Sequence, residues 1–379
     1  MVMRLRWLVV LALLGSATLA WLALTPSAAL REGPLIVFVP PHEGILGIAA
    51  RLGEADVVRS RLAFLATAVV RGVPRSLKAG EYEVPRNATT WTVVSLLEGG
   101  HVRQRAVLHP EGATISELGR VFEAEALAPA DAIARVAGDK KFLAAQGVEA
   151  PSAEGYLFPD TYQFVRGMSP EEMLGRMIQR MRAKLTPAIR ERAQARGLSV
   201  HELLTLASII EREAVVKDEQ RLISAVFWNR LRIGMPLQAD PTVQYAVAKE
   251  RRALSRADLL VDHPYNTYVR AGLPPGPIAS PGLGAIEAAL DPAPVQYLFF
   301  VAQDDKRHHF SMSVDEHNRA VARYRRMRSS EGALVRALER GAVAPSDASP
   351  RMRTRIARAK TRARTEVTPR RGVRLARSK

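Results

Sequence analysis

Two glutamates near the end of a predicted helix are the residues best placed for acid chemistry. Residues 201–216 (HELLTLASIIEREAVV) are apolar on nearly all sides, and Ser199 with Glu202 forms a capping box that predicts the helix start. Glu211 and Glu213 each align with apolar positions at helical spacing. A carboxyl that loses hydration on an apolar face must be paired or stay protonated, and a protonated carboxyl is a general acid. The alternative is a structural glutamate paired with a buried arginine, and periodicity does not choose between the two glutamates.

Three later segments combine aromatic, amide and carboxylate side chains, as a sugar-binding cleft would. Residues 154–162 read EGYLFPDTY, residues 229–242 turn through Gly and Pro, and residues 265–277 form a long loop. The candidate substrate-binding residues are Glu154, Tyr156, Gln238, Asp240, Tyr265 and Asn266. Two alternatives remain: the first segment is a buried turn with locally satisfied Tyr hydroxyls, and Asp240 is only the N-cap before Pro241.

Several other kinds of chemistry have no anchor in the sequence. The chain has no cysteine, which excludes disulfides, thiolate metal sites and thiolate nucleophiles. His308, His309 and His317 lack a clear metal-ligand spacing, so we expect structural or substrate hydrogen bonds from them and no metal. No Gly-rich phosphate loop follows a strand and no G-x-S-x-G is present, so we expect no cofactor.

The N-terminus predicts a membrane anchor. Residues 1–6 carry Arg4 and Arg6, and an uncharged apolar stretch follows, long enough to cross a bilayer core of about 30 Å. We expect residues 1–6 in the cytoplasm, a transmembrane helix over 7–27 and an exported remainder. The alternative is a cleaved signal peptide ending in the small residues 27–29.

The net charge of +17 resembles a nucleic-acid signal until it is placed along the chain. Residues 351–379 hold twelve Lys or Arg and one Glu, so most of the excess belongs to the C-terminal end. We interpret residues 330–379 as a basic, disordered tail that is dispensable for catalysis. The tail either associates with an anionic envelope surface or is an inert extension, and export removes it from nucleic acid.

The elements that must position these residues predict an α+β fold. Residues 33–101 show a strand over 35–39, helices over 44–52 and 59–71, a strand in 77–84, and a helix capped by Thr90 that ends at Gly99–Gly100. Residues 102–329 mix strand and helix patterns irregularly, which favours α+β over a doubly wound sheet. Strands are predicted over 102–108 and 297–302, and helices starting at Thr114, Ser169, Pro187 and Asp218, with a last one from Ser313 to Arg328.

Five ordered segments carry a resemblance to a known family. EGYLFPDTYQF, LASIIEREA, VFWNRLRIGMPLQADPTVQYA, YNTYVRAGLPPGPIASPG and HHFSMSVDEHN resemble the YceG-like endolytic murein transglycosylases, from about residue 35 to 328. The resemblance implies one inner-membrane anchor, a LysM-like module over 33–101 and a catalytic domain over 102–329. It also implies that Glu211, in the A-S-I-x-E motif, is the catalytic acid. The chain departs from the family at Ser280, where Asn is frequent, and at Asp262–His263, which puts fine substrate contacts in doubt.

The activity implied by the resemblance is non-hydrolytic cleavage of peptidoglycan. Such a lyase cuts nascent glycan strands and leaves 1,6-anhydro-muramic ends, which terminates their elongation. The partners expected are peptidoglycan glycan strands, the inner membrane and peptidoglycan synthases, with the catalytic domain in the periplasm. The rival hypothesis is a non-catalytic wall-binding protein, which would share the anchor and the LysM-like module but would not need Glu211.

Overall fold

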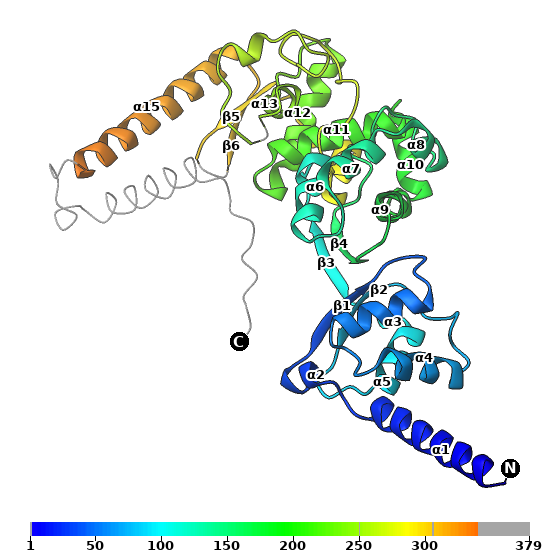
Figure 1. Ribbon diagram of the computed structural model, residues 1–379. Coiled ribbons are helices and arrows are strands. Elements are labelled where there is room, and N and C mark those ends of the chain that lie inside the picture. The colour runs from blue at the N-terminus through cyan, green and yellow to red at the C-terminus, as the bar shows by residue number, and fades with distance from the viewer. Residues whose placement is uncertain (1, 250, 305–306, 340–379) are drawn as a thin grey trace. The chain divides into compact units, whose positions relative to one another are not determined.

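The computed structural model describes residues 2–249, 251–304 and 307–339, which form two compact units (Figure 1). The first unit holds residues 2–211 and 275–286, and the second holds 212–274 and 287–339. Helices dominate both, and three antiparallel sheets of two strands each lie among them. The mixed α+β class predicted from the sequence is therefore confirmed.

The chain begins with an apolar helix, α1 (Val2–Leu24), followed by the short α2 (Ala28–Glu32). At 1.5 Å per residue, the 23 residues of α1 extend about 35 Å, enough to cross a hydrocarbon core. Its apolar side chains are largely exposed, with Trp7 65% and Trp21 55% accessible. A helix with the length and composition of a membrane span is thus present where the sequence predicted one.

A small module follows in the predicted order of strand, two helices, strand and helix. Its elements are β1 (Leu35–Val39), α3 (Ile45–Glu54), α4 (Arg61–Val70), β2 (Gly80–Val84) and α5 (Thr90–Gly99). β1 and β2 pair antiparallel with Val37 opposite Tyr82, and Tyr82 is fully buried in the core of this module. The N-cap of α5 is Thr89 instead of the predicted Thr90, because the Thr89 hydroxyl accepts from the N–H of Thr92.

The first unit continues with a pair of antiparallel strands that lie far apart in the sequence. β3 (Gln104–His109) and β4 (Asp160–Val165) pair antiparallel, with Ala106 opposite Gln163. The remaining helices of this unit are α6 (Ile115–Ala124), α7 (Ala130–Ala137), α8 (Lys140–Ala145), α9 (Pro170–Lys184) and α10 (Pro187–Ala195). The predicted capping boxes at the starts of α6 and α9 are both present. β4 was not predicted, because its residues overlap the segment interpreted as a sugar-binding turn.

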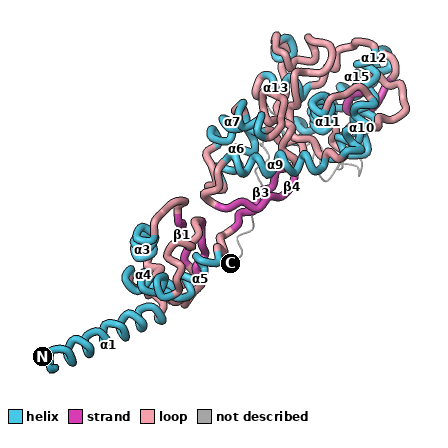
Figure 2. Tube along the Cα trace, turned by 90° about the vertical axis from the view of Figure 1, so that its right-hand side faces the viewer, coloured by secondary structure: helices cyan, strands magenta, loops and turns pink. Residues whose placement is uncertain are grey.

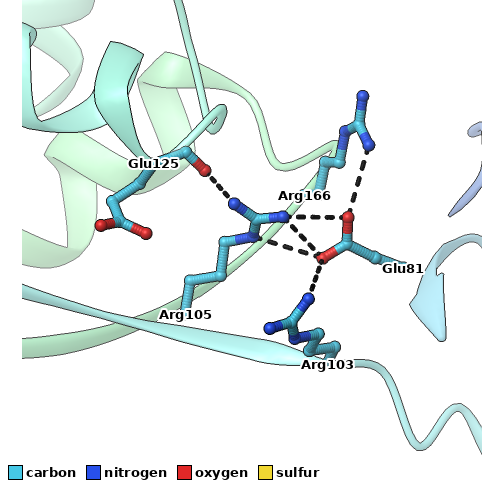
Figure 3. A network of polar contacts seen from close by, with 5 residues as sticks. All are labelled: Glu81, Arg103, Arg105, Glu125 and Arg166. Atoms are coloured by element: carbon cyan, nitrogen blue, oxygen red, sulfur yellow. Dashed lines mark hydrogen bonds and ion pairs between the residues drawn. The ribbon is translucent and has the colours of Figure 1, made fainter. Parts of the chain in front are cut away.

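A buried carboxylate joins β2 to the β3–β4 pair (Figure 3). Glu81 of β2 is 2% exposed and accepts from Nη2 of Arg105 at 2.8 Å and from Nη1 of Arg166 at 3.3 Å, with Arg103 Nη1 at 3.8 Å. Arg105 also donates to the carbonyl of Glu125. Burial alone would raise the pKa of Glu81, but the hydrogen bonds and positive charges of the arginines outweigh burial and lower it. Glu81 is therefore an anion in the folded protein.

Helix α11 (Val200–Glu213) is buried along most of its length. All eight residues from 203 to 210 are buried, including Thr205 and Ser208. Its capping box is the predicted one: the N–H of Glu202 donates to Ser199 Oγ at 3.1 Å, and the N–H of Ser199 donates to the Glu202 carboxylate at 2.8 Å. An apolar helix inside the fold is what the sequence pattern indicated.

The second unit contains α12 (Gln220–Arg232), α13 (Asp240–Ala246), β5 (Phe299–Ala302), β6 (His308–Ser311) and α15 (Val314–Glu339), with 3-10 turns at Lys217–Glu219 and Asp258–Leu260. Helix α14 (Leu283–Leu290) passes from the first unit into the second. β5 pairs antiparallel with β6, which was not predicted. α15 runs past the predicted end at Arg328. Residues 340–379, including the basic stretch 351–379, lie outside the described residues.

Candidate active site

Glu211, the acid implied by the family resemblance, lies near the end of α11 in the first unit. Its carboxylate accepts a hydrogen bond from the N–H of Gly282 at 3.1 Å, and the residue is partly buried. An added Cβ on Gly282 would lie 2.1 Å from the Glu111 carboxylate, so a larger residue there would require the Glu111 side chain to move. A backbone N–H that points at a carboxylate stabilises its charged form. The contact joins Glu211 to the backbone of the segment that contains Gly282.

Two more hydrogen bonds hold the segment 275–282 along α11. Nε2 of His201 donates to the carbonyl of Pro275 at 2.7 Å, and the N–H of Ile278 donates to Ser208 Oγ at 3.0 Å. His201, Thr205, Ser208 and Arg212 form a polar stripe at helical spacing on this otherwise apolar helix. Two of them, His201 and Ser208, bind the segment 275–282, and we call this line of contacts the seam. Nδ1 of His201 lies 2.8 Å from the Tyr156 hydroxyl. Tyr156 is 8% exposed, so nearly all of the residue is buried.

Ser280, where the chain departs from the family pattern, is fully buried in this segment. Its hydroxyl lies 2.8 Å from Nε2 of His109, and its N–H donates to the carbonyl of Ala113 at 2.9 Å. Burial lowers the pKa of His109 to about 4, so the imidazole is neutral. The departure at Ser280 is thus accommodated inside the fold through a buried hydrogen bond.

Glu213, two residues after Glu211, belongs to the second unit and has very different surroundings. Part of the residue reaches the surface, but protein atoms crowd its carboxyl and remove its hydration. This burial, followed by the charge of Asp240, raises the pKa of Glu213 to about 8, against smaller opposing effects of Arg230, Arg212 and the backbone N–H of Asp240. Glu213 is therefore protonated near neutral pH.

Arg230 is a buried cation whose charge acts on Glu213, and its own hydrogen bonds go to backbone carbonyls. It is 6% exposed, and its guanidinium donates to the carbonyls of Leu298 at 2.7 Å and Leu237 at 2.6 Å. Burial lowers the pKa of Arg230, although an arginine keeps its charge at any physiological pH. Because carbonyl oxygens take up these donors, the positive charge offsets the burial of Glu213 only in part.

Asp240 and Gln238 present exposed side chains on either side of the buried Ala239. Asp240 is the first residue of α13 and not its N-cap, which is Ala239. The Tyr268 hydroxyl donates to Asp240 Oδ1 at 2.6 Å, and burial raises the pKa of Tyr268, so the phenol stays protonated. Gln238 has a φ of 49°, and its N–H donates to the carbonyl of Thr267 at 3.0 Å. Both side chains are placed where a ligand in solution can reach them.

The other candidate residues are more deeply built into the fold. Asn266 is fully buried: its amide donates to the carbonyls of Leu259 and Val261, and its oxygen accepts from the N–H of Tyr268. Glu154 is 6% exposed, and its carboxylate accepts from the N–H of Ile115 at the start of α6. Sugar contacts by Asn266 and Glu154 stay predictions, and their burial does not favour them.

Tyr265 is half-buried and packs against Tyr245, with ring centroids 5.0 Å apart.

The second unit brings Glu213, Asp240 and Gln238 together with the unpredicted Arg230 and Tyr268. The first unit brings Tyr156 to His201, which was also not predicted as a site residue. The polar stripe of α11 could have singled out His201. Tyr268 and Arg230 lie inside two of the recognised motifs, but nothing local distinguishes them from their neighbours.

The three C-terminal histidines have structural neighbours. Nδ1 of His308 lies 2.7 Å from the carboxylate of Glu219, which is 3% exposed, and His317 stacks on Phe299 with centroids 5.2 Å apart. Burial, together with the charges of Arg230 and His309, lowers the pKa of His317. Within the described ranges, no group of three or more His, Asp or Glu side chains converges as metal ligands would.

Known proteins are similar to this chain over nearly all of the region described above. The sequence pattern of the YceG-like family matches residues 37–323. An endolytic murein transglycosylase of Bacillus subtilis is 32% identical over 302 residues, covering 76% of this chain and 83% of that protein. One of Streptococcus pneumoniae is 29% identical over 334 residues, and the chain spans 60% of its length. A crystal structure of a yceG-like protein from Listeria monocytogenes superposes with a TM-score of 0.55 at 31% identity, covering 76% of this chain and 99% of that one.

Proposed function

Because the chain belongs to the YceG-like family, we propose that it is a membrane-anchored endolytic lytic transglycosylase of peptidoglycan. The relatives named endolytic murein transglycosylases support a lyase that cuts within glycan strands. The finer part of the proposal is that cutting is non-hydrolytic, leaves 1,6-anhydro-muramic ends and stops the elongation of nascent strands. The observation that supports the chemistry most directly is a carboxyl, Glu213, whose pKa is raised to about 8.

We assign the role of general acid to Glu213. A proton donor must be protonated at the working pH and able to lose its proton in the reaction, and a pKa near 8 meets both needs. Glu211 is the other candidate, and its carboxylate accepts the N–H of Gly282. The assignment of Glu211 implied by the family resemblance stays the alternative, and paired variants decide between the two.

A single carboxyl is sufficient for a lyase. Glycosidases that use water commonly need two carboxylates, one of which acts as nucleophile or activates water. In the proposed reaction, Glu213 protonates the glycosidic oxygen as the bond to the anomeric carbon breaks. The 6-hydroxyl of the same muramic residue attacks that carbon, and the Glu213 carboxylate takes the hydroxyl proton. The carboxyl is thereby restored, and no water enters the products.

Asp240 and Gln238 are proposed to position the sugar near this acid. Their exposed side chains flank the same turn, and Tyr268 holds the Asp240 carboxylate in one orientation. Asp240 also raises the pKa of Glu213 by its charge. Tyr156 and Tyr265 offer aromatic edges or faces suited to pyranose rings.

The proposal extends to the place and partners of the enzyme. The apolar α1 is proposed as a single inner-membrane span with a cytoplasmic N-terminus, and the residues after it lie in the periplasm. Residues 33–101 are proposed as a LysM-like module that contacts glycan. Peptidoglycan strands are the substrate, and peptidoglycan synthases are proposed partners because they produce nascent strands.

Digestion of purified, uncrosslinked glycan strands tests the reaction. We expect each new muramic end to be one water lighter than the product of a hydrolase, and no label to enter that end in ¹⁸O-water. Incorporation of ¹⁸O would indicate a hydrolase, with Asp240 as the first candidate for the second carboxylate. Intact strands after incubation with folded protein would instead favour the rival function, a non-catalytic wall-binding protein.

A further inference from the structure

Helix α4 differs from ordinary surface helices because it is apolar on both faces. Its inner face is buried in the core of the small module through Ala63, Phe64, Thr67 and Ala68. Its outer face exposes Leu62 (70%), Val69 (65%) and Val70 (78%), and Leu62 and Val69 lie seven residues apart on one side. A helix that is apolar all round belongs in a protein core or in a membrane. The outer face of α4 therefore requires a partner other than water.

The C-terminal end of α1 lies against this module. α1 contacts both α4 and α5, and Figures 1 and 2 agree in placing its end beside them. The guanidinium of Arg59 lies 4.6 Å above the ring of Trp21 and donates to the Thr25 hydroxyl at 3.3 Å. Trp21 and Thr25 are at the end of the apolar stretch. If α1 crosses a bilayer, its last turns reach the surface of that bilayer together with the neighbouring α4.

The residues around the exposed apolar side chains are those that favour a membrane surface. Trp91, at the start of α5, is 46% exposed, and the guanidinium of Arg71 lies 5.0 Å above its ring. Trp is enriched where hydrocarbon meets headgroups, and arginine side chains reach from apolar surface to phosphate. Arg59, Arg61 and Arg71 lie at the two ends of α4. Arg61 pairs with Glu54 at 3.3 Å and Arg71 with Glu98 at 2.6 Å. The guanidinium of Arg59 lies over Trp21, where its charge complements anionic headgroups. We call Leu62, Val69, Val70 and Trp91 the α4 face.

We infer that the α4 face lies in the headgroup region of the bilayer that α1 crosses, with anionic phospholipid as its partner. This inference rests on the membrane anchor proposed above. Burial of the α4 face in lipid removes exposed Leu and Val side chains from water. Because α1 and α4 are in contact, both attachments act on the same end of the small module. The module is thereby held against the membrane instead of swinging from a single tether.

The absence of cysteine from the sequence allows a direct test on the full-length protein. Single cysteines at Val70 and at Leu46 are labelled with an environment-sensitive fluorophore in nanodiscs that contain anionic phospholipid. Leu46, in α3, is 71% exposed and is the matched control in the same module. A third label at Leu14, in the middle of α1, reports whether the anchor itself is inserted. Quenching by lipid-attached nitroxides is compared with quenching by aqueous iodide.

We expect the Val70 label to be quenched at least threefold more by nitroxides near the headgroups than the Leu46 label, and to be protected from iodide. The Leu14 label should be quenched by nitroxides deep in the acyl chains. A Val70 label as open to iodide as the Leu46 label, with Leu14 inserted, would overturn the inference and leave the anchor intact. A Leu14 label exposed to iodide would overturn the anchor. Val70→Glu should then raise iodide access at a second label, placed at Leu62, with unchanged circular dichroism.

Discussion

Glu81 and Glu213 are both removed from bulk water, yet the protein holds them in opposite charge states. Three arginines converge on Glu81, and its pKa is lowered despite burial (Figure 3). Glu213 has Asp240 as a charged neighbour, and the nearby Arg230 donates to carbonyls, so burial raises its pKa to about 8. Burial alone thus does not decide the charge of a carboxyl. The balance of neighbouring charges does, and it holds Glu81 as an anion and Glu213 as a neutral carboxyl.

Replacing Glu213 with Gln should have the largest effect on activity, because Gln has no ionisable proton to donate. We expect murein cleavage to fall by about 10²–10⁴-fold, as for a lost general acid, with an unchanged circular dichroism spectrum. Activity is measured as anhydro-muramic ends released from purified strands.

Glu211→Gln is the matched control, because the amide oxygen of Gln can still accept the N–H of Gly282. We expect this variant to lose less than about tenfold in rate, far below the loss of a general acid. If Glu211→Gln loses the larger factor and Glu213→Gln keeps its rate, the acid is Glu211, as the family resemblance implies.

Replacing Glu81 with Gln should destabilise the protein without touching the chemistry. Removing one partner from a fully buried ion pair costs about 3–5 kcal/mol. Arg103 and Arg166 are 40% and 43% exposed and can recover water, so we expect about 2 kcal/mol here. Urea unfolding measures this difference in the free energy of unfolding.

The control for Glu81 is Glu43→Gln, which breaks a more exposed pair with Arg51, 2.9 Å long. This control should cost less than about 1 kcal/mol. Equal losses in the two variants would mean that the cluster around Glu81 contributes no more than a surface ion pair. The contrast between Glu81 as a stabilising anion and Glu213 would then be wrong.

The two carboxyls should give stability opposite slopes against pH. The raised pKa of Glu213 means that the folded state holds its proton between about pH 4.5 and 8, so this group lowers stability as pH rises through that window. The lowered pKa of Glu81 means that its contribution is lost as pH falls below the ordinary range of a carboxyl. Each pKa unit corresponds to about 1.4 kcal/mol.

Urea midpoints measured from pH 3 to 9 on the parent, Glu213→Gln and Glu81→Gln separate these contributions. Glu213→Gln should flatten the upper part of the profile, and Glu81→Gln the acidic part. Cleavage by the parent should also decline above about pH 8, where Glu213 loses its proton. A Glu213→Gln profile with the same upper slope as the parent would contradict the raised pKa.

The smallest effect is expected from Tyr268→Phe, which changes a neighbour of Glu213 indirectly. The Tyr268 hydroxyl donates to Asp240 at 2.6 Å, and without it the Asp240 carboxylate loses a donor but keeps its charge. We expect a rate change of less than about tenfold, about 1.4 kcal/mol in the barrier, and a small upward shift of the alkaline limb of the pH–rate profile. A lost alkaline limb would show that Tyr268, and not Glu213, is the titrating group.

Much of the fold was predictable because its signals are local. The helix starts at Ser199, Thr114 and Ser169 are set by side chains that bind backbone three residues away, and all three were predicted. β4 and β6 were missed. β4 pairs with β3, more than 50 residues earlier in the chain, and neither strand has a turn signature that identifies its partner.

The candidate site was predictable in its residues but not in their roles. Periodicity placed Glu211 and Glu213 on apolar surfaces but could not give the charge of Glu213, which depends on Asp240 and Arg230. Nor could it give the contact of Glu211 with Gly282, 71 residues later. Asn266 was predicted to contact sugar because it lies in a polar loop. In the structure its amide serves the carbonyls of Leu259 and Val261, a use that no local pattern indicates.

The seam between α11 and the segment 275–282 has a consequence for the timing of assembly. Its hydrogen bonds join residues 74, 70 and 71 positions apart, at Pro275, Ile278 and Gly282. A chain is made from its N-terminus, so α11 is complete well before the residues that satisfy its polar stripe exist. Contacts between distant residues form late, after the loop between them has closed. A partly synthesised chain that ends before residue 275 therefore carries α11 without the segment that binds its polar side chains.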